Sequence, residues 1–197
     1  MRTFIAVEPP GSLREEIGRL TARHFESRLP GFRWVKPENI HLTLRFLGEI
    51  DASGLDGLTQ AVCSAAARST PFELTVDSLG FFGSKQKPRV VWLGLGASPQ
   101  LSALAAEVEG AVAEAGFGRA DKPFRAHLTL ARMKRPPASP PDWESVRSIL
   151  PSSWPGWKVS HVEIIKSTLA PSGPVYQTLA RCPLVGEAGE ITDEGGQ

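Results

Sequence analysis

The chain has little cysteine and no long apolar run. Only Cys63 and Cys182 occur among 197 residues, and they lie 119 positions apart. They form neither a CxxC pair nor a dense disulfide framework, so a reduced, cytoplasmic protein is the simplest interpretation. No segment approaches the roughly 18 apolar residues that span a bilayer, which predicts no membrane contact. An acid and two prolines at residues 8–10 come too early for a signal peptide.

A strong excess of one charge is also missing, because the net charge is +1. The charges are unevenly placed, however. Residues 186–197 carry four acids and no base, whereas residues 119–135 carry six bases and one acid. A mildly basic body favours a phosphate-bearing partner, although a solvated surface explains the same pattern. The acidic, glycine-rich tail at 186–197 is predicted to be disordered.

Helical spacing and strand-like alternation are mixed along the chain. Helices are predicted at 12–29, 53–68, 98–116 and 141–150, with a capping-box spacing from Ser12 to Glu15 and Ser98-Pro99 at the start of the third. Strands are predicted at 2–8, 32–35, 41–47, 72–82, 89–95, 126–132, 158–169 and 175–182. Paired strands between helices indicate an α+β fold with largely antiparallel sheets. Residues 1–185 are expected to form a single domain.

One internal repeat dominates the sequence. His41-Leu42-Thr43-Leu44 recurs unchanged as His127-Leu128-Thr129-Leu130, 86 residues later, and a Lys-Pro pair precedes each copy. Such a repeat predicts two pseudo-symmetric lobes, flanked by helices, around a central cleft. Side chains alternate across a strand, so each histidine shares a face with its threonine while the leucines anchor the other face.

Two imidazoles and two hydroxyls in one cleft suit chemistry on a phosphodiester. In-line attack on phosphorus needs a base on the entering oxygen and an acid on the leaving oxygen, and histidine fits both roles near neutral pH. Threonine hydroxyls donate hydrogen bonds to phosphate oxygens. This chemistry alone does not assign which histidine is acid and which is base. His24 and His161 have no matching threonine and are interpreted as surface and structural residues.

Other interpretations compete for the same residues. A metal hydrolase would use the histidines as ligands, but HxH and HExxH spacings are absent and threonine is a poor ligand, so no metal and no cofactor are predicted. A non-catalytic RNA-binding module would rely on the basic residues 119–135 instead. A phosphodiesterase acting on a small cyclic nucleotide or a 2′-5′ oligonucleotide would share the fold and the histidines.

The doubled motif and its context resemble a known family. Two H-x-T-x motifs about 85 residues apart are typical of the two-histidine phosphoesterase superfamily, and the chain is similar within it to the bacterial and archaeal RNA 2′,3′-cyclic phosphodiesterases, also called 2′-5′ RNA ligases. The resemblance covers about residues 1–183. Its supporting segments are RTFIA at 2–6, WVKPENIHLTLRFLG at 34–48, GFF at 80–82, PRVVW at 88–92, PFRAHLTLAR at 123–132, STL at 167–169 and Tyr176.

The resemblance implies a function and roles for the repeated residues. It implies two similar α+β lobes and metal-free hydrolysis of a 2′,3′-cyclic phosphate RNA end to a 2′-phosphate, with 2′-5′ ligation as the reverse reaction. His41 would be the proton donor, His127 the proton acceptor, and Thr43 and Thr129 would bind the phosphate. The implied partner is RNA, with tRNA fragments among the candidates. A monomer is expected.

Arginines and aromatic residues near the motifs are further candidates. Arg132 matches a family arginine that follows the second motif, yet by alternation it shares a face with the leucines, so it reaches the cleft only if the strand ends or bulges. Arg45 and Arg125 have the parity of the cleft. Three aromatic residues are candidates for stacking on RNA bases, although such residues more often pack in cores: Trp34, Phe46 and Phe82.

Overall fold

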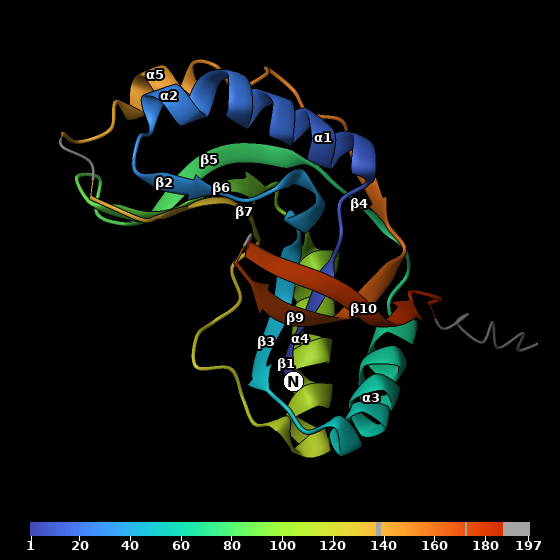
Figure 1. Ribbon diagram of the computed structural model, residues 1–197. Coiled ribbons are helices and arrows are strands. Elements are labelled where there is room, and N and C mark those ends of the chain that lie inside the picture. Colours follow the sequence, from blue (N-terminus) through green and yellow to red (C-terminus); the bar gives the residue numbers. More distant parts are fainter. Residues whose placement is uncertain (137–138, 172, 187–197) are drawn as a thin grey trace, which may run out of the picture.

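The computed structural model describes residues 1–136, 139–171 and 173–186 (Figure 1). The predicted disorder of the acidic tail beyond Gly186 concerns residues that lie outside these ranges. The strands are β1 (Arg2–Val7), β2 (Phe32–Trp34), β3 (Leu42–Glu49), β4 (Phe72–Leu74), β5 (Val76–Gly83), β6 (Pro88–Leu95), β7 (His127–Met133), β8 (Trp157–Val159), β9 (His161–Ala170) and β10 (Gly173–Pro183). The α-helices are α1 (Gly11–Leu20), α2 (Glu26–Arg28), α3 (Leu55–Ala67), α4 (Pro99–Val112) and α5 (Trp143–Arg147).

An antiparallel sheet forms the body of the protein. Its strand order is β10-β9-β1-β3-β7-β6-β5, with β2 paired to β7, while β4 and β8 form a separate two-stranded sheet. The α+β class with largely antiparallel sheets is therefore confirmed. Between β3 and β7 the pairing is the single rung Leu42–Leu128, and at this point the sheet divides into two lobes.

Each lobe contains strands from both halves of the chain. The His41 lobe consists of β1, β3, β9 and β10 with α3 and α4, and the His127 lobe consists of β2, β5, β6 and β7 with α1, α2 and α5 (Figure 1). The elements β1, α1 and β3, with α2 and the short strand β2 between α1 and β3, correspond to β6, α4 and β7 in the second repeat, and each repeat places its helix on the other repeat's lobe. The two copies of the repeat are thus interleaved rather than laid end to end.

A continuous apolar core underlies both lobes. Ile5, Leu42, Leu93 and Leu128 are fully buried in it. Because β1 is covered on both faces, its other face contributes to a second small cluster of Phe4, Ala6 and Ile165, with Tyr176 packed against them. Removing this much apolar surface from water is the main stabilising contribution to such a fold.

Most predicted elements are confirmed, with three local corrections. Residues 72–82 and 158–169 were each expected to be one strand, but each divides into two strands that lie in different sheets. The first helix begins at Gly11 after Pro10, so the Ser12 capping box is wrong. Ser98 does cap α4, because its hydroxyl accepts a hydrogen bond from the Leu101 amide at 3.1 Å.

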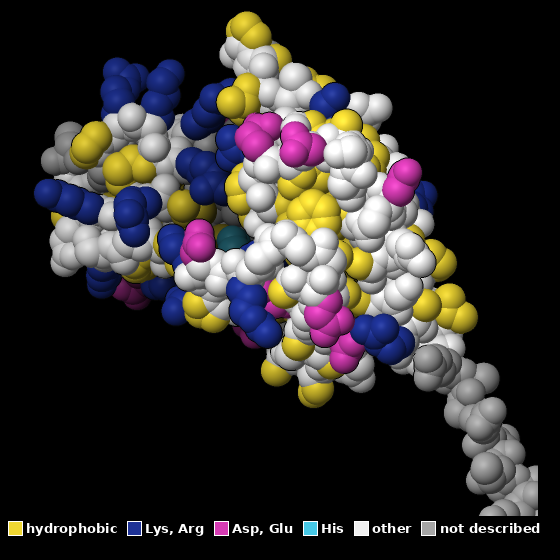
Figure 2. Space-filling view, turned by 90° about the horizontal axis from the view of Figure 1, so that it is seen from below, with side chains coloured by type: hydrophobic (Ala, Val, Ile, Leu, Met, Phe, Trp, Pro, Cys, Tyr) yellow, Lys and Arg dark blue, Asp and Glu magenta, His cyan; other side chains and the backbone are white. Residues whose placement is uncertain are grey.

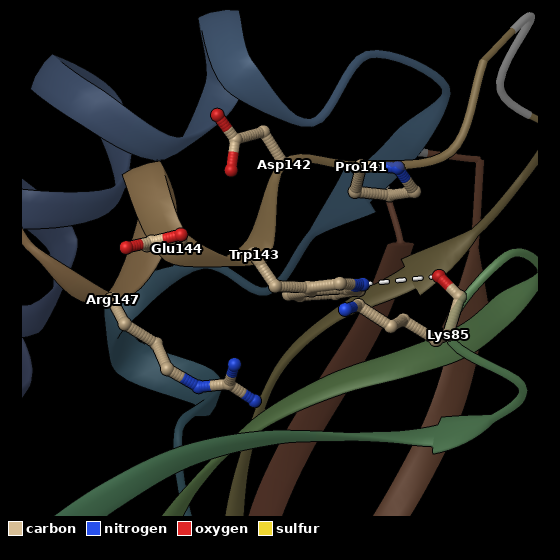
Figure 3. A pocket seen from close by; sticks show the side chains of 6 residues that line it. All are labelled: Lys85, Pro141, Asp142, Trp143, Glu144 and Arg147. Atoms are coloured by element: carbon tan, nitrogen blue, oxygen red, sulfur yellow. Dashed lines mark hydrogen bonds between the residues drawn. The ribbon is translucent and has the colours of Figure 1, made fainter.

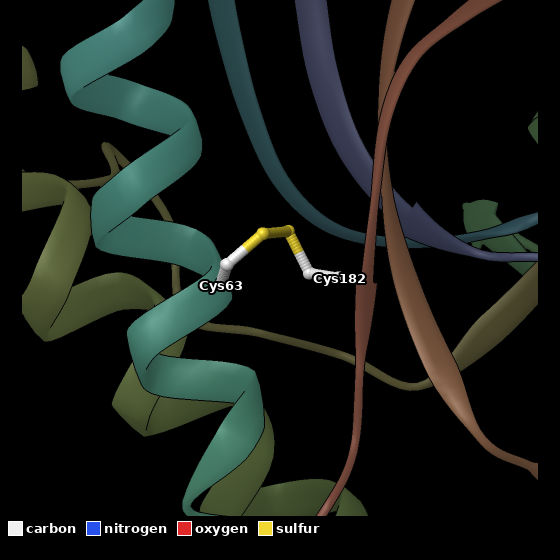
Figure 4. Close-up of a disulfide and its surroundings, with 2 residues drawn as sticks. All are labelled: Cys63 and Cys182. Atoms are coloured by element: carbon white, nitrogen blue, oxygen red, sulfur yellow. A yellow bond between two sulfur atoms is a disulfide. The ribbon is translucent and has the colours of Figure 1, made fainter.

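The expectation that the cysteines stay unpaired is wrong. Cys63 on α3 and Cys182 on β10 form a disulfide, with their Cα atoms 4.6 Å apart (Figure 4). Since α3 packs against the β10 edge, residues 119 positions apart in sequence become neighbours, and sequence spacing carries no sign of this contact. The cytoplasmic prediction loses its argument from unpaired cysteines and stays a prediction.

Within the described parts of the chain, no helix combines the length and apolar character that a membrane crossing requires.

Candidate functional site

The two HLTL motifs lie side by side where the lobes meet. Leu42 and Leu128 pair across β3 and β7 and are fully buried, while each histidine and threonine is partly exposed on the opposite face. The burial pattern of residues 41–47 is the same, position by position, as that of residues 127–133. A space-filling view shows a histidine inside a hollow whose rim carries several Lys and Arg side chains, together with an acidic side chain and hydrophobic ones (Figure 2). The predicted convergence of the two motifs is therefore present.

Each imidazole is oriented by the same backbone hydrogen bond. The His41 ring lies with Nδ1 2.7 Å from the Asn39 carbonyl oxygen, and the His127 ring with Nδ1 2.7 Å from the Arg125 carbonyl oxygen. A carbonyl oxygen only accepts, so Nδ1 must donate in both rings. This fixes the tautomer and leaves both Nε2 atoms free to exchange a proton with a bound molecule.

Aromatic rings hold the imidazoles in place. The His41 ring centroid lies 4.7 Å from that of Phe4 and 5.3 Å from that of Tyr176. The His127 ring centroid lies 5.0 Å from that of Phe82. Trp92 lies 6.2 Å from the His127 ring, and it fits there because its neighbour Gly80 has no Cβ to collide with the indole.

Both histidines favour the neutral form in the free protein. Burial lowers the pKa of His41 to about 4, and the charges of Arg132 and His127 act in the same direction, against the Asn39 hydrogen bond that raises it. Burial lowers the pKa of His127 as well, and Arg132 adds to that effect. A neutral His127 can accept a proton. An anion between the rings would favour the charged form of His41.

Thr43 and Thr129 point to the same face as the histidines. Thr43 pairs with Ala6 of β1 and Thr129 with Trp92 of β6. Among the described residues, neither hydroxyl forms a hydrogen bond within the chain. Both are therefore available to donate to a ligand held between the histidines.

A β-bulge decides which arginine faces the cleft. On β7, Leu130 is an extra residue between the pairs Trp92–Thr129 and Val91–Ala131, so Leu130 and Ala131 are both buried and the alternation shifts by one. Arg132 consequently lies on the histidine face, and its charge lowers the pKa values of both histidines. The bulge in β7 is thus the local irregularity that Arg132 needs in order to reach the cleft.

The same bulge on β3 turns Arg45 away from the cleft, so the parity prediction for this residue is wrong. Leu44 is the extra residue, and Arg45 is only 7% exposed. Its Nε lies 3.2 Å from a Glu109 carboxylate oxygen, and its Nη2 donates to the Gly118 carbonyl at 3.0 Å. Arg45 therefore joins β3 to α4 and the loop that follows it.

Arg33 was missed from the sequence. It pairs with Arg132 across β2 and β7, so both side chains lie on the same face, and a Cβ on Gly173 would lie 2.7 Å from an Arg33 nitrogen. A second cation therefore stands beside Arg132. No motif marks it, because β2 was too short and irregular to give a face from its pattern.

The other histidines are placed elsewhere. His161 Nε2 lies 3.2 Å from an oxygen of the buried Glu163, which also accepts hydrogen bonds from Thr178 and Arg181. These partners keep the pKa of Glu163 low despite its burial. His24 lies on the helical turn that follows α1. The structural interpretation of His161 fits this polar cluster.

Comparisons with known proteins agree with the doubled motif. The family model described as LigT like phosphoesterase matches residues 7–92 and 95–176, and each segment holds one HLTL motif. The chain belongs to this family. The fold is similar to that of solved structures: the TT0787 protein of Thermus thermophilus superposes with a TM-score of 0.76 at 31% identity, covering 95% of this chain and 100% of that chain.

Other similar proteins match over nearly their full length. The E. coli LigT complexed with 3′-AMP has a TM-score of 0.75 and 30% identity, covering 93% of this chain and 97% of that one. A Thermotoga maritima protein named RNA 2′,3′-cyclic phosphodiesterase is 33% identical over 189 residues, which are 94% of this chain and 97% of that protein. An Archaeoglobus fulgidus protein of the same name is 34% identical, and the match covers 91% of this chain and 98% of that protein.

A separate hollow of about 400 Å³ lies around Trp143, between α5 and the β5–β6 turn (Figure 3). The Trp143 indole donates to the Lys85 carbonyl at 3.0 Å, and its ring stacks on Phe81. Two acids offset the two bases that line this hollow, and it contains no residue of either HLTL motif. No cluster of three or more potential metal-ligating side chains occurs within residues 1–136, 139–171 and 173–186.

Proposed function

We propose that this protein is a metal-independent RNA 2′,3′-cyclic phosphodiesterase that leaves a 2′-phosphate. The observation that carries the proposal is the pair of equivalent imidazoles, each with Nδ1 held by a carbonyl and Nε2 free, beside two threonines and Arg132. The names of the Thermotoga maritima and Archaeoglobus fulgidus relatives support this substrate. A 3′-nucleotide also occurs with the E. coli relative.

The proposed reaction uses the two histidines on opposite sides of phosphorus. His127 takes a proton from water as the water oxygen bonds to phosphorus, and the bond from phosphorus to the 3′ oxygen breaks. His41, protonated in the complex with the anionic substrate, gives its proton to that leaving oxygen. Thr43, Thr129 and Arg132 donate hydrogen bonds to the non-bridging oxygens as charge builds on them.

The test is product analysis on an RNA oligonucleotide that ends in a 2′,3′-cyclic phosphate, in excess chelator. We expect the wild type to release a 2′-phosphate end. His41→Ala and His127→Ala should each lose at least about 10²-fold in kcat, because each removes one proton transfer. His24→Ala is the matched control and should retain activity. Activity that vanishes with chelator, or survives in both cleft variants, would contradict the proposal.

Ligation follows when an RNA 5′-hydroxyl replaces water in the same step, and cleavage of the resulting 2′-5′ linkage to the cyclic phosphate is its reverse. The hydroxyl would attack the same phosphorus, His127 would take its proton, and a 2′-5′ linkage would form as the 3′ oxygen leaves. We propose RNA ends, including those of tRNA fragments, as substrates, and a monomer as the acting form, since one chain supplies both histidines. The mass from light scattering, measured during turnover, should be that of one chain, which tests the proposed monomer.

A further inference from the structure

The equivalent bulges in β3 and β7 turn Phe46 toward the cleft. Leu44 on β3 and Leu130 on β7 are extra residues at the same place in each repeat, so position five after each histidine turns to the cleft face. In the second repeat that position is Arg132 and in the first it is Phe46. Phe46 pairs with Phe4, whose ring contacts His41, and this places Phe46 on the histidine face of the His41 lobe.

Phe46 is unusually exposed for a large aromatic side chain. It is 49% exposed, and the Arg2 guanidinium lies over its ring, 5.0 Å from the centroid. The charge of Arg2 also lowers the pKa of Tyr176, which contacts His41, although burial outweighs that effect and leaves the Tyr176 pKa raised. The Phe46–Arg2 pair is therefore continuous with the aromatic residues that hold His41.

The other two aromatic candidates, Trp34 and Phe82, pack against rings of the protein itself. Trp34 packs against the core, with its ring 6.0 Å from that of the buried Phe25. Phe82 lies against His127 and Trp92. Of the three, Phe46 alone presents a large exposed area on the cleft face.

The direction of the reaction selects the lobe that receives the nucleoside. Under the proposed function, His41 protonates the 3′ oxygen of the ribose and His127 faces the water. The ribose and its base therefore extend over the His41 lobe. Phe46 lies five residues after His41, and because Leu44 is an extra residue in the bulge, about four strand steps of roughly 3.3 Å separate the two, a distance on the scale of one nucleoside.

We propose that Phe46, with Arg2 over its ring, is the stacking platform for a nucleobase at the RNA end, an inference that rests on the proposed function. The ring offers a flat apolar face to any base, and the guanidinium adds a charge close to the RNA backbone. This arrangement predicts binding with little base preference. It also assigns the two equivalent positions different tasks, with Arg132 contacting the phosphate and Phe46 the base.

The test compares two RNA ends that differ only in the terminal base. One oligonucleotide carries a normal nucleotide with a 2′,3′-cyclic phosphate, and the other an abasic ribose with the same group. Phe46→Ala should lower kcat/KM by about 10- to 100-fold on the normal end and by less than about threefold on the abasic end. Phe46→Trp should keep nearly full activity on both, as should Val185→Ala, a control at an exposed apolar residue.

An equal loss of kcat/KM on the normal and abasic ends, or no loss on either, would overturn the proposal that Phe46 stacks on the base. Fluorescence anisotropy of labelled RNA bearing a 2′-phosphate end separates this inference from the proposed function. If the wild type shows no turnover, the proposed function fails, and the anisotropy measurement alone then tests whether Phe46 binds the terminal base. Binding that weakens with Phe46→Ala only when the base is present supports the platform, and unchanged binding overturns it.

Discussion

At the residue scale, the low pKa values of the two histidines determine how activity depends on pH. In the free enzyme, the pKa of His41 is about 4 and that of His127 lies below its usual value. Both limbs of the kcat/KM profile should therefore lie below about pH 6.5, and kcat/KM should fall as the pH rises above that value. A substrate phosphate bound between the two rings is expected to raise both histidine pKa values, so the kcat profile should lie at higher pH. A kcat/KM profile that is flat from about pH 5 to 8 would contradict these shifts.

The threonine hydroxyls are the second prediction at this scale. Thr43→Ala and Thr129→Ala should each lower kcat by about 10- to 100-fold, because each removes one donor to the charged phosphate oxygens. Thr43→Ser and Thr129→Ser keep the hydroxyl and should recover most of that loss. Initial rates with saturating substrate give the comparison. Serine variants as impaired as the alanine variants would show that the methyl group, and not the hydroxyl, matters.

At the element scale, the disulfide links α3 to the edge strand β10. It closes a loop of more than about 100 residues, so replacing Cys63 and Cys182 with alanine should lower the free energy of unfolding by about 2–4 kcal/mol. Urea unfolding of the purified protein, with and without reductant, measures this. Reductant should lower the urea midpoint of unfolding of the wild type and leave that of the double variant unchanged. Two titratable thiols in the folded, non-reduced protein would contradict the link.

The element scale also shows where prediction from sequence stops. The HLTL repeat was enough to place both histidines and both threonines on one face, because strand alternation is a local property. A bulge depends on the partner strand, so the inward turn of Arg132 and the burial of Arg45 required the β1–β3 and β6–β7 registers. The alternation rule holds up to Leu44 and fails one residue later.

At the scale of the whole molecule, we propose that residues 1–185 act as one cooperative domain. β1 and β3 come from the first half of the chain, but β1 needs β9 beside it. A fragment of residues 1–97 should therefore be unfolded even though it holds a complete HLTL motif. Circular dichroism and amide proton dispersion in NMR spectra measure this. A well-dispersed spectrum from the fragment would show that the first half folds alone.

The interleaved strands also fix an order of events on the ribosome. β1 leaves the exit tunnel first, yet its outer neighbour β9 begins about 150 residues later. At about 5–20 residues per second, β1 waits on the order of 10–30 s for that partner. During this interval the nascent chain carries an unpaired apolar edge. The fold, and with it the site that holds His41 and His127, is therefore completed only in the last part of translation.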